Sequence, residues 1–226
     1  MVEQYLFNIN SSIAKERYVE CLESVGEQQK KQILKYKYEA DRMRALYGKI
    51  MIRELLEKKF HLRKEEQIIE RTSYGKPYIS NLNNIHFNIS HSGDWVLCGV
   101  GENELGLDIE YIGKYHKDIV ERYFTTQEIF YLESLTENEK QRHFYYLWSL
   151  KESFLKCNGK GLSMPLNSIS FNLDLIDDIA QATTNHMEDY QFKCFYELPD
   201  YSVAVCSTKE DILSKLHQFE LNYSRK

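Results

Sequence analysis

The stretch Leu105-Gly-Leu-Asp-Ile-Glu-Tyr-Ile112 restricts what this chain can fold into more than any other part of it. Apolar residues alternate along it with glycine and acidic residues, and this period of two predicts a half-buried strand. Asp108 and Glu110 therefore leave the same face, about 7 Å apart along the strand at roughly 3.3 Å per residue. Gly106 leaves space above that face for a bulky group. The pair is either a solvated strand face or two carboxylates that converge on one cation.

Residues 144–156 predict a helix, with a stop signal at Asn158-Gly159. On a 3.6-residue wheel its buried stripe consists of Leu147, Leu150 and Phe154. A second stripe consists of Trp148, Glu152 and Lys156, with Lys151 on its flank. As a surface ion pair, Glu152 and Lys156 would contribute only about 0.2–0.5 kcal/mol. A helix this rich in aromatic residues is not expected to be wholly exposed, which favours a functional site.

Three carboxylates without a cysteine or histidine cluster indicate a hard cation. Magnesium takes oxygen ligands and usually completes its shell with water and substrate phosphate. Asp108, Glu110 and Glu152 would leave positions open for a phosphate oxygen and a water. The adjacent Lys151 and Lys156 would then neutralise charge on the phosphates.

Composition limits the class of protein. A chain of 226 residues forms one domain or two small ones. Its net charge of −5 does not indicate a nucleic-acid partner. The five cysteines contain no C-x-x-C pair and are interpreted as reduced thiols of a cytoplasmic protein. No signal peptide and no segment of membrane-spanning length is recognised.

Positive charge is concentrated in residues 30–64, which hold twelve Lys/Arg and four Asp/Glu. The difference of +8 leaves −13 for the rest of the chain. The same region has helical periodicity, and its core stripe consists of Leu46, Ile50, Leu55 and Leu56. Most of these cations are expected to be solvated helix charges. A cluster of this size in an acidic protein nevertheless favours a small anionic ligand near one end of the helix.

The order of expected elements recurs, which predicts two similar α+β halves. A helix over about 39–60 precedes Tyr74-Gly-Lys-Pro77 and a hairpin over 87–100. The helix 144–156 precedes Asn158-Gly-Lys-Gly161 and a hairpin over 192–206. We therefore predict a pseudo-dimeric monomer with subdomains 1–105 and 106–226, each a helix packed on a small antiparallel sheet. The cleft between them is the expected ligand site.

Taken as an ordered set, the motifs resemble those of the surfactin-type 4′-phosphopantetheinyl transferases. The set comprises Tyr74-Gly-Lys-Pro77, Phe87-Asn-Ile-Ser-His-Ser-Gly93, Gly106-Leu-Asp-Ile-Glu110 and Trp148-Ser-Leu-Lys-Glu-Ser-Phe-Leu-Lys156. Glu39-Ala-Asp-Arg-Met-Arg44 and Arg122-Tyr-Phe-Thr-Thr-Gln-Glu128 are similar to the family as well. The resemblance covers roughly residues 25 to 206.

The resemblance implies an enzyme that transfers the phosphopantetheine arm of coenzyme A to a serine of an apo acyl, peptidyl or aryl carrier protein. It would release 3′,5′-adenosine bisphosphate and use Mg²⁺, or Mn²⁺ in its place. The carrier proteins implied are those of nonribosomal peptide synthesis, polyketide synthesis or fatty-acid synthesis. Antibiotic biosynthesis is among the implied pathways. The enzyme is expected to be a cytoplasmic monomer without nucleic-acid or membrane partners.

Site residues are carried over from the motifs of the family. The implied metal ligands are Asp108, Glu110 and Glu152, and the implied catalytic residues are Glu152 and Lys156. The implied coenzyme contacts are Arg44, Tyr74, Gly75, Lys76, Pro77, Ser90, His91, Asp108, Lys151 and Lys156. Some relatives carry lysines before the first long helix where this chain has Gln28, Gln29 and Gln32. Which cations of residues 30–64 hold the 3′-phosphate of coenzyme A therefore stays open.

Three further alternatives stay open at this point. The proton of the attacking serine passes either to Glu152 or to a metal-bound water beside it. The chain could instead be another magnesium-dependent enzyme acting on a diphosphate, although it has no P-loop. It could also be a non-catalytic module that binds coenzyme A or a carrier protein.

Carrier docking is expected to rely on apolar side chains, because an acidic transferase does not attract acidic carriers by charge. The predicted surface lies between the Asp108 strand and the second long helix. Its residues are Tyr111, Tyr115, Ile119, Tyr123, Phe124, Ile129, Phe130 and Tyr131. Burial in the core is slightly favoured for Phe124 and Phe130.

Overall fold

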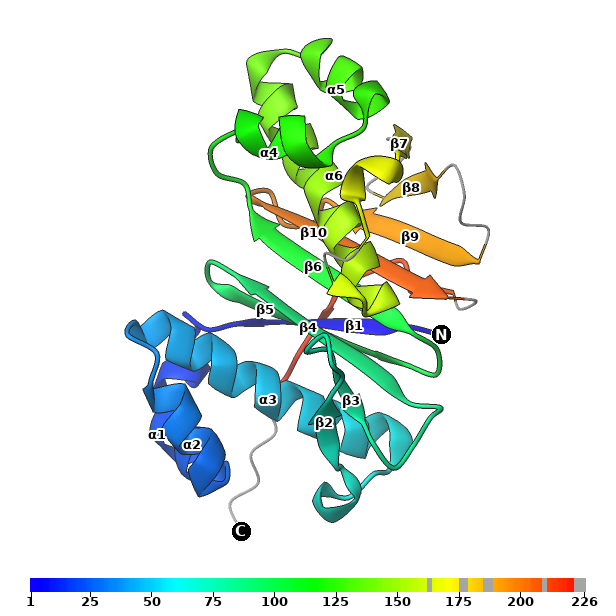
Figure 1. Cartoon of the computed structure of the whole chain (residues 1–226). Coiled ribbons are helices and arrows are strands. Elements are labelled where there is room, and N and C mark those ends of the chain that lie inside the picture. The colour runs from blue at the N-terminus through cyan, green and yellow to red at the C-terminus, as the bar shows by residue number, and fades with distance from the viewer. Residues whose placement is uncertain (162–163, 175–178, 185–188, 209–210, 222–226) are drawn as a thin grey trace.

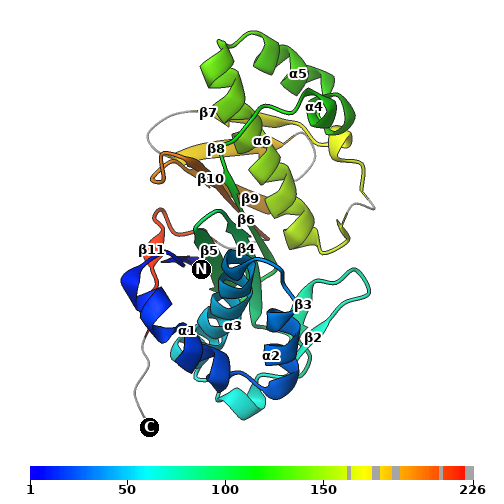
Figure 2. The ribbon, with the colours of Figure 1, turned by 90° about the vertical axis from the view of Figure 1, so that its left-hand side faces the viewer.

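The computed structural model describes residues 1–161, 164–174, 179–184, 189–208 and 211–221. Two α+β halves lie one above the other, and a view turned by 90° shows the same arrangement (Figures 1 and 2). The predicted fold class, two α+β subdomains with antiparallel sheets, is confirmed except that one short strand pairs in parallel in the N-terminal half. No helix of the described part of the chain is long and apolar enough to cross a bilayer.

The N-terminal half packs helix α3 Glu39–Phe60 against a four-stranded sheet, and two further helices, α1 Ser12–Ser24 and α2 Glu27–Leu34, pack against α3. The sheet has the order β11-β1-β5-β4, with β1 Glu3–Asn8, β4 His86–Ser92, β5 Trp95–Gly101 and β11 His217–Gln218. A separate hairpin joins β2 Ile69–Arg71 to β3 Pro77–Ile79. Helix α3 buries the predicted stripe of Leu46, Ile50, Leu55 and Leu56.

The C-terminal half packs helix α6 Glu137–Asn158 across a five-stranded sheet of order β6-β10-β9-β8-β7. Its strands are β6 Leu105–Tyr111, β7 Phe171–Asp174, β8 Ile179–Thr184, β9 Tyr190–Phe195 and β10 Tyr201–Thr208. Two short helices, α4 Lys117–Tyr123 and α5 Thr126–Glu133, precede α6. Helix α6 begins earlier than predicted because Glu139 accepts a hydrogen bond from the Thr136 backbone N–H, at 3.0 Å. It ends as predicted at Gly159, whose φ is 72°.

Strand β6 is buried on both faces along residues 105–109, so the expectation of a half-buried strand was wrong. Leu105, Leu107 and Ile109 face an apolar cluster that contains residues of both halves. The opposite face, with Gly106 and Asp108, lies against α6 rather than solvent. The space that Gly106 leaves is therefore filled by a helix of the same chain.

The end of the chain returns to the N-terminal half, which the predicted subdomain 106–226 did not anticipate. Strand β11 pairs in parallel with β1, and His217 lies opposite Tyr5. Leu221 is buried in the core of the N-terminal half. Residues 211–221 thus pack on the first half, and residues 222–226 lie outside the described residues.

The two sheets meet at strands β4 and β6, each of which is an edge strand of its own sheet. Side chains of β4, instead of its backbone, accept hydrogen bonds from the N–H groups of β6. The three bonds are Leu107 N to Asn88 Oδ1 at 3.0 Å, Ile109 N to Ser90 Oγ at 3.3 Å and Tyr111 N to Ser92 Oγ at 2.9 Å. We call these three bonds the side-chain ladder. The ladder satisfies donors on the open edge of β6 and holds the halves in register.

Candidate active site

Ser90, Asp108 and Lys156 meet where the halves join. Lys156 Nζ lies 2.7 Å from Asp108 Oδ1 and 2.9 Å from Ser90 Oγ. Ser90 Oγ also donates to Asp108 Oδ1, at 3.1 Å. These residues come from α6, β6 and β4 respectively, so three elements from both halves place one ammonium beside one carboxylate.

The three predicted metal ligands form an acidic group that is poorly compensated. The second carboxylate oxygen of Asp108, Oδ2, is buried and has no hydrogen-bond partner among the described residues. Burial and the Asp108 carboxylate raise the pKa of Glu110 to about 7. Burial, and then the same carboxylate, raise the pKa of Glu152. The Asp108 carboxylate thus makes ionisation of Glu110 and of Glu152 less favourable, which a cation would reverse.

A hard divalent cation suits this donor set, because all donors are carboxylate oxygens and one of them lacks a partner. In the described part of the chain, however, no three His, Cys, Asp or Glu side chains already stand in a metal-binding arrangement. The Lys156 ammonium takes one oxygen of Asp108 in this conformation. Side-chain rearrangement would therefore have to accompany metal binding.

Lys151 does not reach the acidic group. Its side chain is fully buried, and its Nζ lies 2.8 Å from an equally buried oxygen of Glu128. The same ammonium donates to the carbonyl oxygens of Leu166 at 3.0 Å and Ile169 at 2.6 Å. This placement differs from the expected phosphate contact of Lys151, because its three donors are used inside the C-terminal half in this structure.

Ser90 is also placed differently from the expectation. Its side chain is buried, and its hydroxyl is engaged with Ile109 N, Asp108 and Lys156. A hydroxyl has one proton to donate and two lone pairs to accept with, so all of its capacity is used. Ser90 therefore links the halves in this structure, and its hydroxyl is not presented to a coenzyme.

The Tyr74–Pro77 turn connects β2 to β3 at the edge of the site. Tyr74 is exposed, and Gly75 has a φ of 89°, a conformation that favours glycine. Lys76 crosses to the C-terminal half, where its Nζ pairs with Glu104 and donates to the Cys157 carbonyl oxygen at 2.9 Å. The turn is thereby anchored beside the end of α6.

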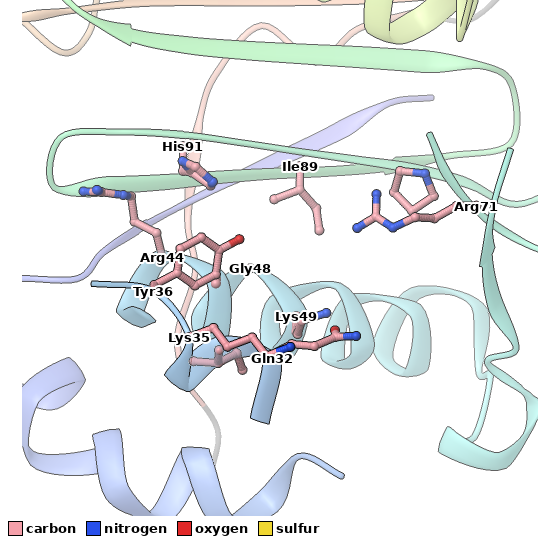
Figure 3. Close-up of a pocket in the computed structure, with 12 residues that line it drawn as sticks. Gln32, Lys35, Tyr36, Arg44, Gly48, Lys49, Arg71, Ile89 and His91 are labelled. Atoms are coloured by element: carbon pink, nitrogen blue, oxygen red, sulfur yellow. The ribbon is translucent and has the colours of Figure 1, made fainter. Parts of the chain in front are cut away.

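A cavity of about 600 Å³ opens in the N-terminal half (Figure 3). Four of its twelve lining residues are lysines or arginines, namely Lys35, Arg44, Lys49 and Arg71. His91 and Pro77 also line it. The described lining residues all belong to one half, so this cavity approaches the junction at His91 rather than lying between the halves.

Charge is compensated unevenly around the cavity. Arg44 forms an ion pair with Asp41 and donates to the Gly93 carbonyl oxygen, so its guanidinium is already engaged. At the other end, burial and then Arg71 and Arg53 lower the pKa of Lys49. Neither Lys49 nor Arg71 has an acidic partner among the described residues, and Figure 3 shows them apart from the Arg44–His91 end.

His91 connects the cavity to the junction. Partial desolvation by the cavity wall, and then the Arg44 guanidinium and the Lys156 ammonium, lower the pKa of His91. The His91 ring therefore interacts electrostatically with both cations.

Lys49 and Arg71 are the residues that the motifs did not identify. Lys49 is one of twelve Lys/Arg in residues 30–64, and no sequence motif distinguishes it from the other eleven. Arg71 lies three residues before Tyr74, outside the quoted turn. The two residues reach one cavity because α3 and the β2–β3 hairpin, which are distant in sequence, both contribute to its lining.

The predicted docking residues divide into core and surface. Phe124 is buried, as favoured from the sequence, whereas Phe130 is 73% exposed, so the expectation of burial was wrong for it. Tyr111 is 52% exposed. The remaining members are partly buried against the core of the C-terminal half, namely Tyr115, Ile119, Tyr123, Ile129 and Tyr131.

Comparison with known proteins follows the same division of the chain. Residues 104–206 match the family model described as 4′-phosphopantetheinyl transferase superfamily. Residues 12–103 match the model described as 4′-phosphopantetheinyl transferase, N-terminal. The 4′-phosphopantetheinyl transferase Sfp of Bacillus subtilis (strain 168) is 30% identical over 92% of both chains. The 4′-phosphopantetheinyl transferase psf-1 of Bacillus pumilus is 37% identical over 77% of this chain and 75% of the relative.

The chain belongs to the 4′-phosphopantetheinyl transferase family. This membership confirms the surfactin-type resemblance and the enzyme class, 4′-phosphopantetheinyl transferase, that the motifs predicted. Family members of this class use coenzyme A as the donor of the transferred group.

Proposed function

We propose that the chain transfers the 4′-phosphopantetheine arm of coenzyme A to the hydroxyl of a serine in an apo carrier protein. The observation that supports this most is the position of Lys156, whose ammonium stands between the halves beside Asp108 and its unpartnered oxygen. A cation at that place would contact the bridging and terminal oxygens of a diphosphate held between the halves.

We place the 3′-phosphate of coenzyme A against Lys49 and Arg71. Coenzyme A carries two phosphate regions, and Lys156 accounts for the diphosphate. The 3′-phosphate then needs cations without acidic partners, which Lys49 and Arg71 supply, whereas Arg44 is already paired with Asp41. An ammonium and a guanidinium on opposite walls suit a dianionic phosphate.

Asp108, Glu110 and Glu152 would hold Mg²⁺, or Mn²⁺ in its place. When bound, the ion supplies a positive charge that draws electron density from the diphosphate oxygens. The residues support this assignment through their oxygen-only donor set, the raised pKa of Glu110 and the unpartnered oxygen of Asp108.

In the proposed reaction the serine oxygen of the carrier bonds to the phosphorus that bears the pantetheine arm. The bond from that phosphorus to the bridging oxygen breaks, and 3′,5′-adenosine bisphosphate leaves. The serine proton passes to Glu152 or to a water beside it; the raised pKa of Glu152 supports the carboxylate. Lys156 stabilises the charge that develops on the leaving oxygen.

The carrier is proposed to dock on the exposed apolar side chains Tyr111 and Phe130 of the C-terminal half. Carriers of nonribosomal peptide, polyketide or fatty-acid synthesis are the proposed partners. A cytoplasmic location is proposed, which the five free and buried cysteines support, and the protein is proposed to act as a monomer.

Mass spectrometry of the carrier tests the proposal directly. Purified protein is incubated with apo carrier, coenzyme A and Mg²⁺, and the expected result is a carrier heavier by one phosphopantetheine. Omission of Mg²⁺ and the Asp108→Ala variant are the controls and should leave the carrier unmodified. No mass gain on several unrelated apo carriers contradicts the proposal, and diphosphate cleavage without any carrier would favour the rival hydrolase.

A second experiment tests the site of the 3′-phosphate. Lys49→Gln and Arg71→Gln should each weaken coenzyme A binding by about tenfold, as expected for a lost charge-assisted hydrogen bond. Binding of 3′-dephospho-coenzyme A should change much less, because it lacks the group concerned. Lys58→Gln is a matched control, since Lys58 is exposed on the same helix and does not line the cavity. Equal losses for both ligands would contradict the assignment.

A further inference from the structure

Ser92 connects one of the proposed metal ligands to the interface between the halves. It is the last residue of β4 and is followed by Gly93, which has a φ of 52°. Its Oγ lies 2.9 Å from Tyr111 N and 3.1 Å from Glu110 Oε2. None of the family motifs considered above assigns it a role.

Hydrogen-bond chemistry determines which way the Ser92 hydroxyl points. The Tyr111 N–H can only donate, so Ser92 Oγ must accept from it. The single hydroxyl proton is then available for Glu110 Oε2, which must accept. The bond is thus made to a carboxylate oxygen of Glu110 and fixes where that oxygen lies relative to β4.

The Ser92 bond restrains a side chain that lies near the end of its strand. Glu110 is two residues from Asp108 on the same face of β6, where the strand becomes less buried. A glutamate side chain has three rotatable bonds, so a fixed donor such as Ser92 Oγ reduces the number of positions that its carboxylate adopts.

The side-chain ladder contains an internal comparison. Ser90 and Ser92 each accept one backbone N–H of β6 and donate to an acid, Asp108 or Glu110. Asn88 accepts the Leu107 N–H in the same way, and no bond from Asn88 to an acid is among those described. Substitution of Asn88 therefore removes only one bond of the side-chain ladder. Substitution of Ser92 removes one bond of the ladder and also the bond to the Glu110 carboxylate.

We propose that Ser92 is a positioning residue that orients the Glu110 carboxylate toward a divalent cation shared with Asp108 and Glu152. This inference rests on the proposed function, because it takes the three acids as metal ligands. Residues that orient a metal ligand typically contribute 10- to 100-fold to metal affinity.

The test is Mn²⁺ binding to the protein alone, measured by the EPR signal of free Mn²⁺. Ser92→Ala should weaken Mn²⁺ binding by about tenfold or more. Ser92→Thr, which keeps the hydroxyl, should restore most of the affinity. The Ser92→Ala variant is expected to fold, because the Tyr111 N–H that loses its partner lies on an exposed residue that water reaches.

Asn88→Ala is the matched control. It should lower the melting temperature, because it leaves the buried Leu107 N–H without its acceptor, and it should leave Mn²⁺ affinity within about twofold. In transfer assays, Ser92→Ala should need more Mg²⁺ for half-maximal rate, with KM for coenzyme A unchanged at saturating Mg²⁺.

The outcomes separate this inference from the proposed function. If wild-type protein binds no Mn²⁺, the metal assignment fails and the role of Ser92 fails with it. If wild-type protein binds Mn²⁺ and folded Ser92→Ala binds it equally well, only the role of Ser92 is overturned. Equal losses in Ser92→Ala and Asn88→Ala would also overturn it, because the effect would then belong to the ladder and not to the carboxylate.

Discussion

Gly106 of β6 lies so close to Ser153 of α6 that a Cβ at position 106 would overlap the Ser153 carbonyl oxygen. The same Cβ would overlap the backbone nitrogen of Cys157, one turn further along the helix. The absence of a side chain at Gly106 therefore allows α6 to lie directly on β6. This contact sets the distance between Asp108 on the strand and Lys156 on the helix.

Gly106→Ala should destabilise the protein by about 1–3 kcal/mol or more, because the colliding atoms are backbone and cannot rotate away. Urea unfolding at equilibrium measures the change. Gly26→Ala is the control, since nothing lies within 4 Å of a Cβ built there. Its cost should stay below about 1 kcal/mol, and an equal loss in both variants would argue against the close helix contact.

Asp108→Ala, Glu110→Ala and Glu152→Ala should each reduce the transfer rate at least about 100-fold while the fold is kept, because each removes a proposed ligand of a catalytic cation. The rate is measured by mass gain of an apo carrier at saturating Mg²⁺. Circular dichroism and the melting temperature are the controls for folding. Near-normal turnover in any one variant would remove that residue from the metal site.

Glu110→Gln should stabilise the metal-free protein above pH 7. The folded pKa of Glu110 is about 7, above its ordinary value of 4.5, so the unfolded chain loses this proton first as pH rises. Stability from this group therefore falls between about pH 4.5 and 7 and stays reduced above that. After a discount for its partial exposure we expect about 1 kcal/mol, or roughly 2–4 °C in melting temperature, at pH 8.

The comparison of melting curves at pH 4 and pH 8 decides this point. At pH 4 wild-type protein and the Glu110→Gln variant both carry an uncharged group at position 110. The difference between their melting temperatures should therefore nearly disappear. A constant difference at both pH values would mean that the carboxylate charge is not the cause.

Lys156→Ala should lower kcat much more than it raises KM for coenzyme A, because its charge is needed where charge develops in the reaction. Lys151→Met should instead lower stability by about 3–5 kcal/mol, since it leaves the buried Glu128 carboxylate without its cation. Steady-state kinetics and urea unfolding of both variants measure the contrast.

Glu128→Gln in the Lys151→Met background completes that comparison, because it removes the uncompensated charge and should restore part of the stability. A Lys156→Ala variant with unchanged kcat would mean that Lys156 only binds coenzyme A. A stable Lys151→Met variant with lost phosphate affinity would reinstate the phosphate contact first expected of Lys151.

Phe130→Ser should raise KM for apo carriers several-fold and leave KM for coenzyme A and the melting temperature unchanged, because the ring is 73% exposed and contributes little to the core. Val19→Ser is the control, since Val19 is 68% exposed on α1 in the other half. Carrier KM should also depend little on salt. A steep rise with ionic strength would indicate docking on the basic segment 30–64 instead.

Local patterns in the sequence determined the elements that carry the site. The core stripe of α3 follows from helical periodicity, and the end of α6 follows from the glycine that the left-handed conformation favours. The alternation around Asp108 predicted β6, because side chains of a strand point to opposite faces. Together with the ordered motifs, these patterns were sufficient to identify the family.

Tertiary packing alone decided what each of these side chains contacts. Lys151 and Lys156 lie five positions apart on one helix, yet one pairs with Glu128 in the core and the other with Asp108 at the junction. Likewise, Lys49 and Arg71 share a cavity only because α3 and the β2–β3 hairpin both line it in the folded chain. Helical spacing determines which way a side chain points. It does not determine which residue that side chain contacts, because the contacting residue belongs to a strand or helix from a distant part of the chain.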